Sequence, residues 1–192
     1  LSAQFIKYGA NDFLSKSFLP EEFFCRVMQN MRTMDLIDQL NNAATTDYLT
    51  GLKNRHYFYE FGKQLIASAE RGQITVTVAM LDLDHFKAVN DTYGHDGGDQ
   101  VLKSVSACLS SMVRSTDMVV RIGGEEFALL LVNMRPDYLA TYFEKLRGAI
   151  AGLEIIQRNQ PIRITASIGV ASAKIQPLAA MVEQADQMLY RA

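Results

Sequence analysis

The chain of 192 residues has no tryptophan, four prolines and only two cysteines. Its thiols, Cys25 and Cys108, are far apart and form no Cys-x-x-Cys pair. This spacing excludes a disulfide framework and a cysteine-rich zinc site, and it indicates a reducing compartment. No apolar run approaches the roughly 18 residues of a membrane span, and no signal peptide is visible. We therefore expect a cytoplasmic globular protein.

Positive and negative charges are nearly balanced. The chain has 19 lysines and arginines against 21 aspartates and glutamates, a formal net charge of −2. Proteins that bind nucleic-acid polymers usually carry a basic excess, so the composition gives no case for such a partner. A single nucleotide could still bind through a metal and a local site. The hydrophobic content of 48% is enough for one sizeable core.

The first residues have the pattern of a domain end. Residues 12–16 read as a short strand, and Pro20, Glu21 and Glu22 suit the first turn of a helix. Residues 8–27 resemble the last strand and helix of a response-regulator receiver domain, whose phosphate-contacting lysine matches Lys16. Ser17 stands where that family usually has proline. Since the phosphorylated aspartate would precede Leu1 and no methionine begins the chain, we expect an excerpt of a longer protein.

A helix over residues 25–45 is predicted to link two domains. Its apolar positions keep helical spacing with one phase shift; they are Phe24, Val27, Met31, Met34, Ile37, Leu40 and Ala44. This pattern suits pairing with a second copy in a short coiled coil with a stutter. The alternative is an ordinary amphipathic helix packed on its own domain.

The rest of the chain alternates between helical and strand patterns. We expect helices near 57–66, 99–113, 135–151 and 177–192, and strands at 74–83, 118–120, 127–132 and 163–172. Such alternation predicts an α/β or α+β fold with a mixed sheet.

Residues 121–127, Arg-Ile-Gly-Gly-Glu-Glu-Phe, lie between two apolar runs and predict a β-hairpin. Gly123 and Gly124 supply the positive φ angles that a tight turn needs. Adjacent strand residues face opposite sides, so Glu125 and Glu126 need not share one role. A surface hairpin without function would also accept these residues.

Two acidic motifs follow predicted strand or loop positions. Asp82 and Asp84 close the central strand, where carboxylates suit a hard cation such as Mg²⁺, and Lys87 adds a positive charge for phosphate. Asp84 could instead cap a helix.

Asn90 and Asp99 bracket a polar, glycine-punctuated loop and offer donors and acceptors suited to a guanine edge. Asp99 could equally be an N-cap of the following helix.

Several motifs occur in one order and spacing. They are residues 47–55 (DYLTGLKNR), 82–87 (DLDHFK), 90–99 (NDTYGHDGGD), 121–127 (RIGGEEF), 165–170 (TASIGV) and 185–192 (ADQMLYRA). Over about residues 45–192 the chain resembles a GGDEF domain. The resemblance implies a nucleotidyl-cyclase, palm-like fold, with a mixed central sheet, surrounding helices and a β-hairpin that carries Gly-Gly-Glu-Glu-Phe. It also implies a diguanylate cyclase, in which a homodimer condenses two GTP molecules to cyclic di-GMP and releases two pyrophosphates.

The resemblance assigns roles to matching residues. The Mg²⁺ or Mn²⁺ ligands would be Asp82, the Leu83 carbonyl and Glu125, while Glu126 would assist the metal or the 3′-hydroxyl. The remaining substrate contacts would be Asn90 and Asp99 for guanine, His85, Phe86 and Lys87 for phosphate, and Gly123 and Gly124 for close backbone approach. An aspartate rather than a serine at position 99 favours GTP. Two cations can stabilise both oxygens of an in-line displacement, so no protein nucleophile is required.

Arg114 and Asp117 resemble the family's Arg-x-x-Asp inhibitory site for the cyclic product, and Arg147 is a further candidate there. Such a tetrapeptide also arises by chance. The expected domains are 1–24 (receiver end), 25–45 (linker helix) and 46–192 (GGDEF domain, truncated before the family's triphosphate-binding lysine and arginine). Two alternatives stay open: a catalytically inactive GGDEF module that binds GTP or cyclic di-GMP, and a purely structural dimerisation module.

Overall fold

The computed structural model describes residues 18–172 and 176–191 and divides into two units between Asn42 and Ala43. Helix α2 (Pro20–Thr45) has proline and two glutamates in its first turn, and none of its residues is buried. Its apolar side chains are exposed, among them Phe24, Met31, Met34 and Leu40. The predicted helix is therefore confirmed, and its pairing with a second copy stays a prediction. The strand expected at 12–16, with Lys16, lies outside the described residues.

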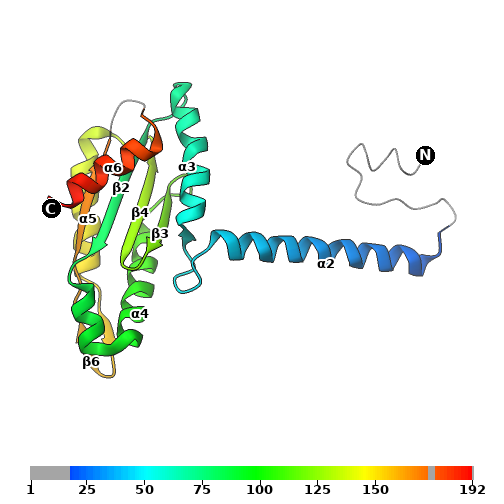
Figure 1. Cartoon of the computed structure of the whole chain (residues 1–192), viewed down its shortest axis with the longest axis horizontal. Helices are drawn as coiled ribbons and strands as arrows, with labels where there is room; N and C mark the ends of the chain where they lie inside the picture. The colour runs from blue at the N-terminus through cyan, green and yellow to red at the C-terminus, as the bar shows by residue number, and fades with distance from the viewer. Residues whose placement is uncertain (1–17, 173–175, 192) are drawn as a thin grey trace. The chain divides into compact units, whose positions relative to one another are not determined.

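The second unit is built on a five-stranded sheet with the order β1-β3-β4-β2-β7 (Figure 1). β1 runs parallel to β3, and the other neighbours are antiparallel, so the predicted mixed sheet is confirmed. β5 and β6 form a separate two-stranded sheet. The elements are β1 (Lys53–Asn54), α3 (Arg55–Glu70), β2 (Val76–Leu83), α4 (Phe86–Met112), β3 (Met118–Gly123), β4 (Glu126–Val132), α5 (Pro136–Ala151), β5 (Ile155–Gln157), β6 (Gln160–Ile162), β7 (Ala166–Ala171) and α6 (Leu178–Leu189).

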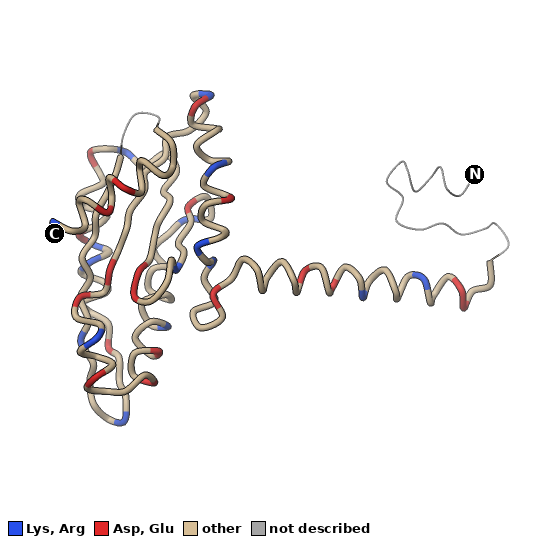
Figure 2. The backbone as a smooth tube through the Cα atoms, in the orientation of Figure 1, with Lys and Arg blue, Asp and Glu red and all other residues tan. Residues whose placement is uncertain are grey.

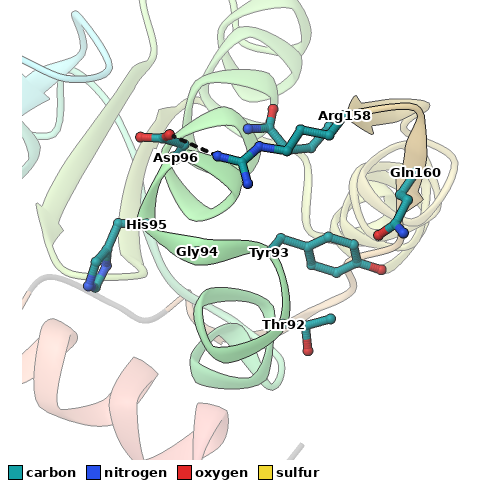
Figure 3. Close-up of a pocket in the computed structure, with 8 residues that line it drawn as sticks. Thr92, Tyr93, Gly94, His95, Asp96, Arg158 and Gln160 are labelled. Atoms are coloured by element: carbon teal, nitrogen blue, oxygen red, sulfur yellow. Dashed lines mark ion pairs between the residues drawn. The ribbon is translucent and has the colours of Figure 1, made fainter.

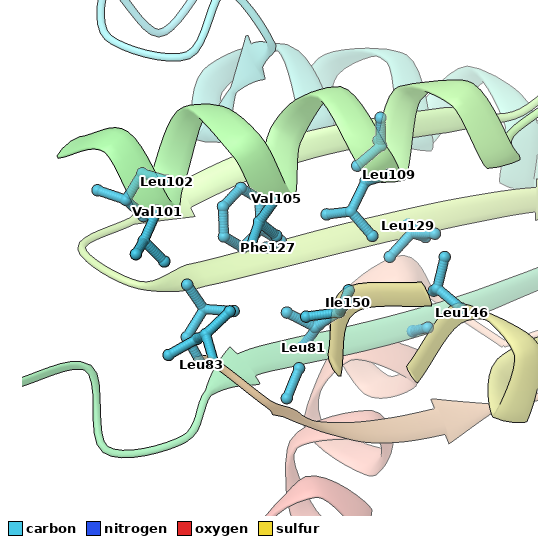
Figure 4. Packing of buried hydrophobic residues seen from close by; sticks show 14 of the residues in the cluster. Leu81, Leu83, Val101, Leu102, Val105, Leu109, Phe127, Leu129, Leu146 and Ile150 are labelled. Atoms are coloured by element: carbon cyan, nitrogen blue, oxygen red, sulfur yellow. The ribbon is translucent and has the colours of Figure 1, made fainter. Parts of the chain in front are cut away.

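Helices cover both faces of the sheet. α4 and α5 pack on the face that carries Leu81 and Leu129, and Figure 4 shows Val105 of α4 and Leu146 of α5 meeting that layer. α3 and α6 pack on the opposite face, against residues such as Val78 and Leu130. β2 lies between β4 and β7 and is buried on both sides, which explains why all of its residues except Thr77 and Asp82 are apolar.

The loop predicted at 90–99 is wrong. Helix α4 already begins at Phe86 and bends at Gly94, whose φ of 75° and ψ of 172° break the helical path. Asp99 lies five residues beyond that bend, inside the helix, so its alternative as an N-cap is also wrong. Gly97 and Gly98 are buried and packed against Tyr93 and Asn90, and they permit close helix packing rather than a loop.

Three short strands, β1, β5 and β6, were absent from the sequence prediction. β5 and β6 are three residues each, and their connecting residues Arg158 and Asn159 have positive φ angles of 49° and 63°. The turn uses no glycine. The strand predicted over 163–172 is confirmed only from Ala166 to Ala171.

Candidate active site

A group of carboxylates gathers at the end of β2. Asp82 is in register with Glu126 of β4 on one side and with Ser167 of β7 on the other. Partial burial raises the pKa of Asp82 to about 6, and nearby negative charges add to this rise, those of Glu125, Glu126 and Asp84. Figure 2 shows acidic residues at the end of β2 and on the β3–β4 connection. Bringing these charges together costs free energy that a bound cation would offset.

The donor atoms at this point suit a hard divalent cation. Within the described residues, no three His, Cys, Asp or Glu side chains form a ready-made metal centre. The candidate set implied by the resemblance combines the Asp82 and Glu125 carboxylates with the Leu83 backbone carbonyl. All of these donors are oxygens, the ligands that Mg²⁺ and similar cations prefer. The residues present fit such an ion.

The connection between β3 and β4 leaves its backbone open. The strands are antiparallel neighbours joined by Gly124 and Glu125, and Gly124 has a φ of 53° that L side chains rarely adopt. A Cβ atom at Gly123 or Gly124 would meet no atom within 4 Å. Packing would accept a side chain at Gly123, whose positive φ of 158° nevertheless favours glycine, and the open surface allows a ligand to approach the main chain.

Arg121 holds this turn from the protein side. Its guanidinium donates to the Gly124 carbonyl through Nε at 3.0 Å and Nη2 at 2.7 Å. Its Nη1 donates to Asp47 at 3.1 Å, and the two side chains are only 12% and 18% exposed. Ion pairs of this limited exposure are screened less than surface pairs. The segment that follows α2 is thus fastened to the turn that carries Glu125.

Asp47 is held in place by its own neighbours. It accepts hydrogen bonds from the Thr50 backbone N–H at 2.9 Å and from the Thr50 hydroxyl at 2.6 Å. Partial burial alone would raise the pKa of Asp47, but the hydrogen bonds from Thr50 and Arg121 outweigh it and lower the pKa. Asp47 therefore stays ionised as the partner of Arg121 over the physiological range.

The two residues predicted to bind guanine come from either side of the bend in α4. The side chain of Asn90 lies across Gly98, because a Cβ atom at Gly98 would be 2.0 Å from Asn90 Oδ1 and 3.1 Å from Phe86 Cζ. Asp99 follows Gly98 directly. The bend therefore folds Asn90 back toward the turn of helix that carries Asp99.

The predicted phosphate turn lies where α4 begins. His85 precedes the helix in a left-handed conformation (φ 57°, ψ 27°), and no side-chain hydrogen bond caps the helix there. The alternative that Asp84 caps this helix is therefore wrong. The first turn of α4 has no acidic residue and carries the exposed Lys87. The positive end of the helix dipole and a lysine favour an anion at this helix end.

A polar cavity of about 440 Å³ lies between the bend of α4 and the β5–β6 sheet (Figure 3). Asp96 and Arg158 face each other across it at 3.8 Å, and Tyr93 donates to the Pro161 carbonyl at 3.3 Å. His95 and Gly94 also line this cavity. None of the described residues predicted to bind GTP or metal lines this cavity.

The Arg-x-x-Asp pair has divided roles. Asp117 accepts hydrogen bonds from the backbone N–H groups of Arg114 at 3.2 Å and Val132 at 2.9 Å, so its carboxylate shapes the loop. Arg114 is exposed. Arg147 pairs with Glu144 at 2.8 Å and lines a cavity of about 420 Å³ whose walls include Asp84. A role for Arg147 beside Arg114 stays a prediction.

Sequence reasoning missed three of these contacts. They are the Arg121–Asp47 ion pair, the hydroxyls of Thr165 and Ser167 on Asp84, and the packing of Asn90 on Gly98. The only sequence signal for the contacts of Asp84 was the alternation of hydroxyl residues at the start of a predicted strand.

Over residues 18–172 and 176–191, no helix has the length and apolarity needed to cross a membrane.

A family model described as "Diguanylate cyclase, GGDEF domain" matches residues 44–192. Response regulator PleD of Caulobacter vibrioides is 32% identical over 198 aligned residues, covering 97% of this chain and 44% of PleD. Diguanylate cyclase DgcP of Pseudomonas aeruginosa is 38% identical over 157 residues, covering 81% of this chain and 23% of DgcP. The crystal structure of the coiled coil and GGDEF domain of DgcB from Caulobacter crescentus, in complex with c-di-GMP, gives a TM-score of 0.83 at 32% identity, over 88% of this chain and 91% of that one. The chain spans less than half the length of these two curated relatives.

Proposed function

The chain belongs to the GGDEF family of diguanylate cyclases, and we propose that it condenses two GTP molecules to cyclic di-GMP with release of two pyrophosphates. The observation that carries this proposal is the gathering of Asp82, Glu125 and Glu126 next to the anion-favouring start of α4. A phosphoryl-transfer site needs both features, because it must neutralise and position a triphosphate.

In this proposal Mg²⁺ or Mn²⁺ is held by Asp82, Glu125 and the Leu83 carbonyl. When bound, the cation supplies positive charge at the reacting phosphate. Glu126 would assist the metal or the attacking 3′-hydroxyl, a role supported by its exposure and by its position opposite Asp82 in the ladder. Lys87 and the backbone N–H groups at the start of α4 orient the phosphates.

The remaining contacts set substrate and orientation. The Asn90 amide and the Asp99 carboxylate select guanine, because the carboxylate accepts from donors that adenine lacks. The open backbone at Gly123 and Gly124 lets the nucleotide lie close to the turn. Each domain holds one GTP, so two copies must face each other for both new bonds to form.

We assign the homodimer contact to α2 and keep the domain order 1–24, 25–45 and 46–192. The support is the unburied apolar surface of α2 and the similarity to PleD, which is named a response regulator. The receiver end would then transmit its state through the linker helix. The ion pair of Asp47 with Arg121 joins the segment at the start of the GGDEF domain to the turn with Glu125.

The proposal is tested by incubating the chain with GTP and either Mg²⁺ or Mn²⁺ and separating the nucleotides by chromatography. A second protein extended beyond Ala192 is run in parallel, because the family places a triphosphate-binding lysine and arginine there. Cyclic di-GMP from either protein supports the proposal. No product from a forced dimer that still binds cyclic di-GMP would favour the inactive binding module.

Gly98→Ala is expected to raise the KM for GTP by about tenfold or more, the effect of weakening one or two hydrogen bonds to the base. The new methyl group would overlap Asn90 Oδ1 and push the Asn90 side chain away from Asp99. Steady-state kinetics with GTP measure the change. In the matched control, Asn90→Ala added to Gly98→Ala should restore thermal stability without restoring the KM. A normal KM in Gly98→Ala would argue against guanine binding by Asn90.

In Arg114→Ala, the concentration of cyclic di-GMP needed for half-maximal inhibition is expected to rise by about tenfold or more. The reason is that charge-assisted hydrogen bonds to phosphate are lost. The uninhibited rate should change little, because Arg114 is exposed in the loop before β3. Arg135→Ala, at another exposed arginine that pairs with Asp137, is the control. Equal inhibition of Arg114→Ala and the wild type would reject the site.

A further inference from the structure

Asp84 is fastened to the start of β7 by three hydrogen bonds. Its Oδ2 accepts from the Thr165 hydroxyl at 2.5 Å, and its Oδ1 accepts from the Ser167 hydroxyl at 2.8 Å. Its backbone N–H donates to the Thr165 carbonyl at 3.0 Å. Both carboxylate oxygens are therefore occupied by protein hydroxyls that lie more than 80 residues away in the sequence.

The place of Asp84 in the sheet makes this fastening important. Asp82 is the last described β2 residue that pairs with β4, whereas the pairing with β7 continues to Leu83 opposite Ala166. Leu83 and Asp84 are thus held from the β7 side alone. Directly afterwards the chain turns through His85 in its left-handed conformation. Without a further contact, the end of a strand held on one side frays easily.

We propose that Asp84 is a positioning residue that fixes the Asp82 carboxylate and the Leu83 carbonyl for metal binding through Thr165 and Ser167. The inference rests on the proposed function of this site and names how its ligands are held. It gives the hydroxyls of the 165–170 motif a role: Thr165 and Ser167 hold the carboxylate side chain next to the ligands, and neither touches the metal. Partners of this kind typically change metal affinity by about 10–100-fold when they are removed.

The test compares hydroxyl removal at the two ends of the same strand pair. Thr165→Val combined with Ser167→Ala removes both partners of Asp84. The control is Ser172→Ala, which removes the hydroxyl that accepts a hydrogen bond from the Thr77 hydroxyl at the opposite end of β2 and β7. Binding of Mn²⁺ alone is measured by titration calorimetry, and the Mg²⁺ concentration for half-maximal cyclic di-GMP synthesis is measured separately.

We expect the double variant to weaken Mn²⁺ binding and to raise the Mg²⁺ requirement by about tenfold, with Ser172→Ala unchanged in both. Thr165→Ser, which keeps the hydroxyl, should behave as the wild type. Asp84→Ala should match the double variant, and combining all three changes should add little, because one interaction is removed in each case.

Two results would overturn the inference. If Asp84→Ala loses Mn²⁺ binding while the double hydroxyl variant keeps it, Asp84 contacts the metal itself. If Ser172→Ala weakens Mn²⁺ binding equally, the effect is general loosening of the sheet. Calorimetry also separates this inference from the proposed function. If the wild type binds Mn²⁺ but makes no cyclic di-GMP, only the proposed function is rejected. If it binds no Mn²⁺, both are rejected.

Discussion

Glu125→Gln is expected to reduce cyclic di-GMP synthesis by at least about 100-fold, the scale seen when a charge-stabilising group is lost from a transition state. The substitution keeps the size of the side chain and removes only its negative charge. Glu125 lies on the connection between β3 and β4 and is not part of either core cluster. Folding should therefore survive, and the lost rate should report on metal and phosphate binding.

The stability of the variant is a second, independent readout. Burial and neighbouring carboxylates raise the pKa of Asp82 from 3.8 to about 6, and Glu125 makes the largest contribution among these carboxylates. An acid whose folded-state pKa is raised destabilises the fold above that pKa, and the penalty disappears as pH falls toward the unfolded value. Metal-free Glu125→Gln should thus be at least as heat-stable as the wild type at pH 7. As the pH falls from 7 to 4, its stability should increase less than that of the wild type.

The measurements are the GTP turnover rate and the thermal midpoint with and without Mg²⁺. Added Mg²⁺ should raise the midpoint of the wild type and leave that of Glu125→Gln unchanged. Glu154→Gln makes the same chemical change at an exposed glutamate before β5 and should retain wild-type turnover. If Glu125→Gln kept more than a tenth of the turnover, Glu125 would not be a metal ligand.

The fold was predictable where one local pattern dominated. The sequence of β2 is apolar except at Thr77 and Asp82, because both faces of the strand are buried, and α5 begins at its proline as expected. The prediction of a loop at 90–99 was wrong because glycine occurs both in loops and where helices pack closely. Local rules read Gly97 and Gly98 as loop residues, whereas here they let Tyr93 and Asn90 pack closely across a bend. Only the tertiary contact distinguishes these uses.

The contacts of the candidate site also fall into those that could be predicted from the sequence and those that could not. The neighbourhood of Asp82 with Glu125 and Glu126 was anticipated only through the resemblance to GGDEF domains, because local pattern placed these residues at a strand end and at a turn without bringing them together. The pairing of Asp84 with Ser167, or of Arg121 with Asp47, depends on which strands are neighbours in the sheet. Local periodicity does not specify strand order, so these second contacts needed the three-dimensional structure.

Gly169→Ala is expected to destabilise the fold by about 3 kcal/mol or more, at the upper end of overpacking effects. A Cβ atom at this position in β7 would lie 2.0 Å from the Ala185 carbonyl oxygen and 2.3 Å from the Leu189 backbone nitrogen. These are backbone atoms of α6, so no side chain can rotate away to make room. The whole helix must move off the sheet.

For a chain of this size, such a loss lowers the thermal midpoint by roughly 6–12 °C. Thermal unfolding followed by circular dichroism measures it. Gly148→Ala is the matched control, because this glycine lies within α5 with no atom near its Cβ position. There the same substitution should stabilise the protein by up to about 1 kcal/mol. Equal midpoints for Gly169→Ala and the wild type would mean that α6 does not dock on β7 this closely.

The position of Gly169 makes the same variant informative about the site. It lies two residues after Ser167, which holds Asp84, and it is in register with Met80, two residues before Asp82. When α6 is pushed outward, β7 can follow it and draw Ser167 away from Asp84. Below its unfolding temperature, Gly169→Ala should therefore need more Mg²⁺ for half-maximal activity than Gly148→Ala. A folded Gly169→Ala with a normal Mg²⁺ requirement would show that β7 keeps its register on β2 independently of α6.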